Sequence, residues 1–312
     1  MIDKQDATGL LSQVQNSAVF ARIVPEQKLR IVEALKADGQ IVAMTGDGVN
    51  DAPSLKAAHI GIAMGGRGTD VAREASAIVL LDDDFGSIVT AIRLGRRIYD
   101  NLRKAMSFIV AVHVPIAGLA LLPLILGLPI IFSPIHIAFL ELVIDPVCSL
   151  VFEAETEEED VMRRPPRSPA ERLLPLPLIG WGALQGVLVF AMAGAMFVFA
   201  LKNGMPGDEV RALTFVSLIG GIFSLVLVNR AFSSSLKLAL VRPNLALLSI
   251  LLGVCAMLGL CLTIPALRNL FRFGVLHLDD LALAVGSALL IFFLLESLKP
   301  LWRTKLAGRR LT

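Results

Sequence analysis

The chain has 312 residues, of which 55% are hydrophobic, and its mean hydropathy of +0.72 is too high for a purely soluble protein. A formal net charge of +2, with no basic run interleaved with aromatic residues, excludes nucleic acid as a partner. Apolar residues concentrate after about Ala105, and the polar N-terminus has no cleavable signal, so we expect a cytosolic part followed by a membrane part.

Residues 1–86 are expected to form a small α/β unit. Helices are predicted over Pro25–Ala37 and Thr69–Ser76, and strands over Gln40–Met44, Ile60–Met64 and Ala77–Leu81, with a further strand or extended segment over Ala18–Val24. Strands that alternate with helices predict a parallel sheet.

The acidic turn Thr45–Pro53 follows the strand predicted over residues 40–44, at the end of a sheet where α/β proteins bind their ligands. Gly46 and Gly48 let the backbone approach an anion closely. Asp47 offers a hard oxygen to Mg²⁺, and Asn50 can donate to a phosphoryl oxygen. A plain capped turn would use similar residues, but nine specified residues in a row favour one wall of a phosphate and magnesium site.

Residues 87–104 are predicted to form a cytosolic stalk helix that runs without a strong stop into the membrane, as a transmitter of motion or an ordinary tether. Its basic residues, among them Arg96, Arg97 and Lys104, match the positive-inside rule. Residues 105–312 are expected to hold six membrane helices of about 20 residues each. These are Ala105–Leu126, Ile135–Phe152, Leu178–Leu201, Arg211–Val228, Leu245–Leu262 and Leu281–Leu298. An even number places both termini in the cytosol, and we expect a multi-pass integral protein of a bacterial plasma membrane.

The loop Glu153–Pro177 is cytosolic on this count. An acidic block comes first, and the basic, proline-rich stretch Arg163–Pro169 follows it. The prolines predict a stiff and extended connection. The two blocks of opposite charge indicate either a solvated surface or a docking contact with the α/β unit, and both readings stay open.

Two carboxylates fall within the second predicted membrane helix. Glu141 and Asp145 are four residues apart and therefore share one face. Each costs about 2.5 to 3.5 kcal/mol to insert, so the pair needs a partner, and a cation would supply one. Pro146 leaves the carbonyl of Leu142 without its usual donor, which adds a third oxygen. A polar contact between helices is the alternative, and the ion site is favoured because ionisable groups at membrane depth are usually functional.

Other polar groups of the membrane part are less specific. His113 is either a ligand, a counter-group that carries a proton, or a histidine satisfied by a backbone carbonyl. Pro115 is expected to free the carbonyl of Ala111, close to His113. Glu296, one turn from Lys299, is expected to snorkel or to form an interfacial ion pair.

Together these features resemble the C-terminal part of a P-type cation-transporting ATPase, nearest the type II pumps that include calcium pumps. The residues that carry the resemblance are Phe20–Lys28, Thr45–Pro53, Ile60–Gly65, Gly95–Asn101 and Met162–Pro169. The resemblance implies a partial haloacid-dehalogenase-like, Rossmann-like phosphorylation domain followed by an all-α bundle of six transmembrane helices. It also implies a reaction in which ATP transiently phosphorylates an aspartate.

The resemblance further implies roles for residues of the first part. Asp47 binds Mg²⁺, and Asn50 and Asp51 complete the catalytic site with Lys28, which contacts the phosphoryl group. The residues implied to bind the nucleotide's phosphate are Lys28, Thr45, Gly46 and Asn50. A lysine and a magnesium ion are what a transferring phosphoryl group needs, because its developing charge must be neutralised.

The sequence also departs from the family pattern. The Asp-Lys-Thr-Gly-Thr signature with the nucleophile, the nucleotide-binding domain and the actuator domain do not occur in it, so we expect the chain to be inactive alone. It would then be part of a pump, and an N-terminal pump fragment is a possible partner. A non-catalytic membrane module, either a truncated remnant or a split-pump subunit, is the alternative, and a membrane-tethered phosphatase of the same fold has less support.

The aligned membrane positions predict the ion. Calcium pumps carry Asn and Glu where His113 and Ile116 stand, and Asn, Thr and Asp where Glu141, Ile144 and Asp145 stand. We infer a single carboxylate-based ion site in the lipid bilayer. Hard oxygen ligands favour Ca²⁺, Mg²⁺ or Mn²⁺, while His113 would admit softer transition metals, and Ca²⁺ is the favoured ion.

Overall fold

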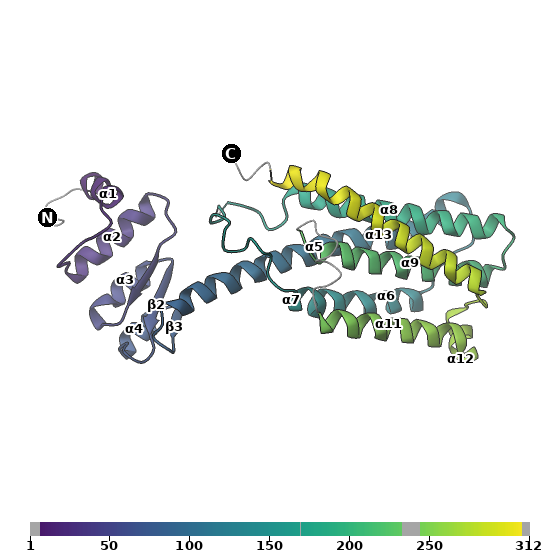
Figure 1. Ribbon diagram of the computed structural model, residues 1–312, viewed down its shortest axis with the longest axis horizontal. Helices are drawn as coiled ribbons and strands as arrows, with labels where there is room; N and C mark the ends of the chain where they lie inside the picture. The colour runs from purple at the N-terminus through teal and green to yellow at the C-terminus, as the bar shows by residue number, and fades with distance from the viewer. Residues whose placement is uncertain (1–6, 169, 233–243, 308–312) are drawn as a thin grey trace. The chain divides into compact units, whose positions relative to one another are not determined.

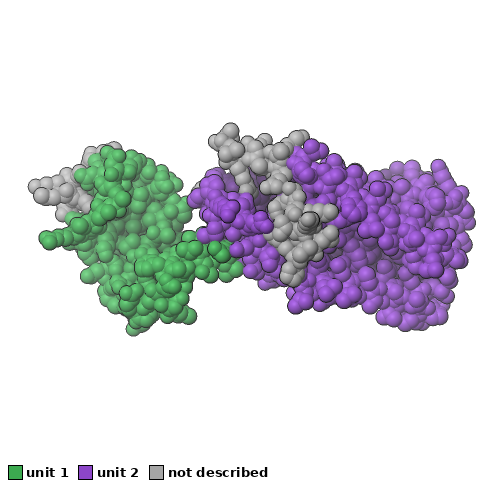
Figure 2. Space-filling view, viewed as in Figure 1, with its two compact units in different colours: residues 1–94 green, residues 95–312 purple. Residues whose placement is uncertain are grey.

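The chain divides into two units, Met1–Leu94 and Gly95–Thr312 (Figure 2). Apolar side chains pack together within each of them. The computed structural model describes residues 7–168, 170–232 and 244–307. Each unit is described below by itself.

Three short parallel strands are the centre of the first unit, in the order β1 (Ala43–Gly46), β2 (Ile60–Met64) and β3 (Ile78–Leu80). The central strand is buried because its apolar residues pack on both faces of the sheet. Ala63 packs with Leu55 and Ala72, whereas Ile62 and Met64 pack with Leu80. The predicted parallel sheet and α/β fold are confirmed.

The helices of the first unit lie beside this sheet (Figure 1). They are α1 (Ala7–Asn16), α2 (Pro25–Ala37), α3 (Ala52–Ala57) and α4 (Asp70–Ala75), and a 3-10 turn, Val49–Asp51, precedes α3. Pro25 starts α2 where its missing N–H costs nothing, and the Thr69 hydroxyl caps α4 by accepting from the N–H of Ala72. The sequence pattern did not predict α1.

Two strand predictions differ from the structure. The strand expected over Gln40–Met44 lies further along, at Ala43–Gly46, and no strand forms over Ala18–Val24. Arg22 has a φ of 53°, a left-handed conformation that ends an extended run. Tertiary context therefore overrides the β-branched composition of that segment.

Helices make up the second unit, and one of them, α5 (Gly86–Leu126), begins in the first. It is a single helix of 41 residues, so the predicted stalk and first membrane helix are continuous. The other long helices are α6 (Pro134–Pro146), α8 (Leu176–Lys202), α9 (Gly207–Asn229), α11 (Leu245–Thr263) and α13 (Leu278–Ala307). Among the described residues, six helical segments are long and apolar enough to cross a membrane, as predicted.

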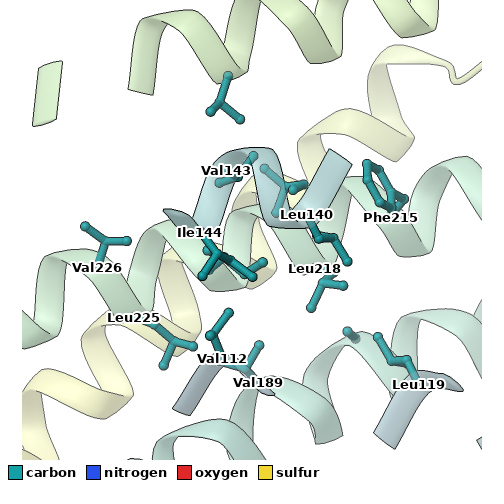
Figure 3. Packing of buried hydrophobic residues seen from close by; sticks show 14 of the residues in the cluster. Val112, Leu119, Leu140, Val143, Ile144, Val189, Phe215, Leu218, Leu225 and Val226 are labelled. Atoms are coloured by element: carbon teal, nitrogen blue, oxygen red, sulfur yellow. The ribbon is translucent and has the colours of Figure 1, made fainter. Parts of the chain in front are cut away.

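Helix α9 is the most enclosed of these segments and packs against α8 and α13. Its side chains Phe215, Leu218 and Leu225 meet Leu140 and Val143 of α6 in one apolar cluster (Figure 3). Because α9 is buried on several faces, its sequence shows little amphipathic pattern, and only the packing distinguishes it from the lipid-facing helices.

Candidate functional site

The acidic turn begins with the last two residues of β1, Thr45 and Gly46, and leads through the 3-10 turn into α3, at the carboxyl end of the sheet. Asp51 is buried there, and its carboxylate accepts a bond of 2.6 Å from Lys28 Nζ of α2. It also accepts from the N–H of Gly48 at 3.3 Å. The fold thus brings together Lys28 and Asp51, which are 23 residues apart in sequence.

Gly46 serves a purpose that differs from the expected one. A Cβ on Gly46 would lie 2.6 Å from the Cβ of Asp51, so the glycine makes room for the Asp51 side chain and not only for an external anion. A larger residue here would push Asp51 away from Lys28. Thr45, one residue earlier, is half-buried in the strand.

The remaining predicted residues of the turn, Asp47 and Asn50, have exposed side chains. The backbone carbonyl of Asp47 accepts from the N–H of Thr69 at 2.8 Å, which fixes the turn to the start of α4. The hard oxygens of an exposed carboxylate and a nearby amide fit Mg²⁺. The turn therefore separates a paired, buried Asp51 from an accessible Asp47.

The pKa of Asp51 lies below its usual range. Burial opposes ionisation of this carboxyl, but the hydrogen bonds from Lys28 and Gly48 and the charge of Lys28 outweigh it. Asp51 is consequently charged at neutral pH and holds Lys28 in place.

In the second unit, Glu141 and Asp145 lie on the exposed side of α6, as does Leu142 between them. Neither carboxylate forms an ion pair with any residue that the structure describes. Immediately after Pro146 the helix widens into a π-helical segment, Val147–Val151. Such segments are rare and frequently accompany functional sites. The two carboxylates therefore share one accessible face beside a backbone distortion.

His113 on α5 is also exposed, and its Nδ1 lies 2.8 Å from the carbonyl of Ile109 on the same helix. The ring is thus satisfied by a backbone carbonyl, which was one of the three expected possibilities. The carbonyl of Ala111, which was expected to lie close to His113, points elsewhere. A Cβ at Gly186 of α8 would come within 2.4 Å of that oxygen, so Ala111 faces the α5–α8 contact.

A segment that we call the strap, residues 155–167, crosses the α5 stalk and joins it to the bundle. Arg164 binds Asp100 through two bonds of 2.5 and 3.1 Å, and Arg96 donates to the carbonyls of Val161 and Arg164 at 2.8 Å each. The guanidinium of Arg167 lies 4.3 Å from the centre of the Tyr99 ring. The loop is thus docked on the second unit itself, which the sequence did not predict.

The strap buries two carboxylates, and both have charged partners. Glu155, 1% exposed, accepts 2.6 Å from Arg230 and 2.7 Å from Asn244 at the start of α11. Glu158 accepts 2.7 Å from Lys104, which is fully buried on α5. Sequence reasoning read these acidic residues as one charged block. No local signal separates them from their exposed neighbours, because their partners come from other helices.

At the other end of the chain, Glu296 and Lys299 form the expected ion pair, with 3.2 Å between Oε2 and Nζ. The pair does not snorkel into solvent, since the Lys299 side chain is only 7% exposed. It is a packed pair within the bundle.

Comparison with known proteins now places these features in a family. A model described as the C-terminus of cation-transporting ATPases matches residues 129–301, and a model of haloacid dehalogenase-like hydrolases matches residues 8–59. The first match spans more than half of the chain. The chain belongs to the cation-transporting ATPase family.

Three relatives illustrate the extent of the match. The chain is 35% identical to a calcium-transporting ATPase of Bacillus subtilis, over 95% of this chain and 33% of the relative. It is 30% identical to the mouse calcium-transporting ATPase type 2C member 2, over 100% of this chain and 33% of the relative. A probable cation-transporting ATPase F of Mycobacterium bovis is 40% identical over 64% of this chain and 22% of the relative. The chain thus spans about a third of the length of the first relatives.

This cation-transporting ATPase chain is a multi-pass integral membrane protein, because the family match coincides with six apolar helices among its described residues. The second family match ends at residue 59 and covers the whole acidic turn. The predicted sites therefore fall within matched regions, except His113, which precedes residue 129 and follows residue 59.

Proposed function

We propose that this chain is the C-terminal part of an ATP-driven cation pump, with Ca²⁺ as the favoured cargo. Residues 1–86 would belong to the phosphorylation domain, residues 87–104 to the stalk and residues 105–312 to the transmembrane domain, with both termini in the cytosol of a bacterial cell. The observation that carries this proposal is the accessible, unpaired carboxylate pair Glu141 and Asp145 on a membrane helix. Calcium-transporting relatives support the choice of ion.

The membrane site follows from the cost of exposed charge. A carboxylate facing lipid near the bilayer centre costs about 2.5 to 3.5 kcal/mol on insertion scales. Glu141 and Asp145 therefore need a cation and a covering surface. Since the chain spans a third of its relatives' length, further membrane helices of the complete protein, or of an N-terminal fragment, would supply that surface. His113 would lie at the edge of the site, and the Leu142 carbonyl, which Pro146 cannot bond, would add a neutral oxygen.

The phosphate site follows from the turn after β1. Asp47, with Asn50 beside it, would hold Mg²⁺, which when bound neutralises charge on a phosphoryl group. Lys28 is positioned by Asp51 and would shift its ammonium toward an incoming phosphoryl oxygen. Thr45 and Gly46 would offer the hydroxyl and backbone that line the same end of the strand. ATP and the acceptor aspartate would come from other parts of the complete pump.

The proposal is tested with the complete protein in proteoliposomes, by measuring ATP hydrolysis and ion uptake across a panel of cations. We expect stimulation by Ca²⁺ that is lost in Asp145→Asn and Glu141→Gln. Glu159→Gln, which changes an exposed carboxylate of the strap, is the matched control and should retain stimulation. Unchanged stimulation in both membrane variants, for every cation in the panel, would refute the proposed ion site.

A second experiment tests whether the aspartate that accepts the phosphate lies outside this chain. The chain incubated alone with γ-labelled ATP should form no hydroxylamine-sensitive phosphate bond, because none of Asp47, Asn50 or Asp51 acts as the acceptor in this proposal. Labelling of the chain by itself would show that a phosphate acceptor lies within this chain and would contradict the proposal.

A further inference from the structure

His136 stands in the first turn of α6, five residues before Glu141 and at the end of the helix opposite the strap. It is fully buried, and its Nε2 lies 3.0 Å from the carbonyl oxygen of Phe271, at the end of α12 (Pro265–Phe271). These two residues are 135 positions apart in sequence. The ring is therefore the point at which the start of the carboxylate-bearing helix is fixed to a distant segment.

The hydrogen bonds determine the state of the ring. The N–H of Ser133 donates to Nδ1 at 3.0 Å, and an N–H can only donate, so Nδ1 carries a lone pair. The Phe271 carbonyl can only accept, so Nε2 carries the proton. The Ser133 hydroxyl lies 2.8 Å from Nδ1 and adds a second donor. The contacts thus fit one neutral tautomer, and they cap the first turn of α6.

The surroundings of the ring oppose a positive charge there. Four phenylalanine rings surround it, with centroids 5.3 to 6.0 Å away: Phe132, Phe215, Phe271 and Phe273. The charged residues carried by the elements packed on the ring are Asp208, Glu209 and Arg211 at the start of α9 and Arg268 and Arg272 around the end of α12. Arg211 acts electrostatically on the ring, and its guanidinium is held by the carbonyls of Ile131 and Arg272 at 2.9 and 2.8 Å. No carboxylate within the described residues forms an ion pair with His136.

We propose that His136 is a positioning residue that makes cation binding by Glu141 and Asp145 sensitive to pH. A protonated ring would place an Nδ1–H against the Ser133 N–H, so the cap of α6 would lose its acceptor. The bond from Nε2–H to the Phe271 carbonyl would be kept, but the contact between Nδ1 and Ser133 would open, so the first turn of α6 would shift and move the helix that carries both carboxylates. The inference rests on the proposed ion site, and its first test does not.

That first test reads the ring directly. The chain labelled with ¹⁵N-histidine in lipid nanodiscs gives nitrogen signals for its four histidines, and His136→Gln identifies those of residue 136. At about pH 8 we expect a protonated Nε2 and an unprotonated Nδ1 for His136, because the Phe271 carbonyl can only accept and the Ser133 N–H can only donate. The opposite tautomer, or a charged ring at that pH, would overturn the proposal whether or not the chain belongs to a pump.

The second test couples the ring to the ion site. Calcium binding to the complete protein is measured from about pH 8 to about pH 5. Protonation of Glu141 and Asp145 weakens binding in every variant, so the difference between variants is the readout. We expect the wild type to lose about tenfold more affinity than His136→Gln, because glutamine retains an acceptor and a donor but cannot take up the proton.

Two further variants complete this test. His136→Phe retains an aromatic ring without hydrogen bonds and should bind calcium weakly at every pH. His277→Gln, at the exposed start of α13, is the matched control and should follow the wild type. Equal profiles for wild type and His136→Gln would refute the role of His136. Absence of saturable binding in all four proteins would instead refute the proposed ion site.

Discussion

Two pairs of carboxylates lie within eighteen consecutive residues and occupy opposite environments. Glu141 and Asp145 of α6 are exposed, and no partner among the described residues neutralises them. Glu155 and Glu158 of the strap are buried against Arg230 and Lys104. A buried charge that is already paired is bound into the structure, whereas an accessible, unpaired charge on a membrane helix is available to a ligand. This difference, more than the presence of acidic residues, identifies the candidate ion site.

The largest effect is expected where the strap is fixed to the bundle. Arg230→Ala leaves Glu155 buried without its cation, and breaking a buried pair in this way costs about 3 to 5 kcal/mol. Thermal unfolding of the chain in detergent, followed by circular dichroism, should show a large fall in the midpoint. Arg163→Ala, an exposed strap arginine, is the control and should change little. Equal midpoints for the two variants would remove the structural role of the buried pair.

The same substitution, glutamate to glutamine, made in each of the two carboxylate pairs compares their contributions to stability directly. Glu158→Gln should destabilise the cation-free chain by about 2 to 3 kcal/mol, because Lys104 loses its charged acceptor. Glu141→Gln removes an unpaired charge from the apolar face of a membrane helix, so it should leave the stability of the cation-free chain unchanged or raise it. Both are measured by denaturant unfolding in the same micelles. A larger loss in Glu141→Gln than in Glu158→Gln would reverse the assignment.

A smaller effect is expected on the packed face of α5. Gly186→Ala places a methyl group 2.4 Å from the carbonyl of Ala111 and should cost about 1 to 3 kcal/mol by overpacking. Gly253→Ala on α11 is the matched control, because its Cβ meets nothing within 4 Å, and alanine there should be neutral or stabilising. The unfolding midpoints of the two variants test whether α5 and α8 approach as closely as described.

The smallest effect is expected in the first unit. There, as in the second unit, one carboxylate is buried and paired, Asp51, and another is exposed, Asp47. The pKa of Asp51 is lowered, so its pair with Lys28 stabilises the fold above the unfolded pKa of about 3.9 and is lost as pH falls through the lower folded value. Asp51→Asn should cost about 1 kcal/mol at neutral pH, since Lys28 is partly exposed. It should also show less acid destabilisation below about pH 4 than the wild type, in hydrogen-exchange measurements on the first unit. Asp47→Asn is the control, and a matching profile in both variants would contradict the assigned pairing.

The sequence by itself determined the features that depend on residues close together in the chain. The parallel sheet, the continuous 41-residue α5, the membrane spans and the shared face of Glu141 and Asp145 follow from periodicity, length and helical spacing. The acidic turn could also be predicted, because its glycines and acidic residues lie within one short stretch of sequence. The expected strand over residues 18–24 was wrong because composition alone cannot foresee a left-handed residue at Arg22.

Only the tertiary structure decided which charges are paired. Lys28 meets Asp51 across 23 residues, Glu155 meets Arg230 across 75, and His136 meets Phe271 across 135. Such pairs depend on how helices pack, and neither residue type nor spacing encodes them when the partner lies on another element. The sequence therefore shows where a carboxylate stands along the chain. Its burial and its partner in the folded structure decide whether that carboxylate stabilises the fold or is available to bind an ion.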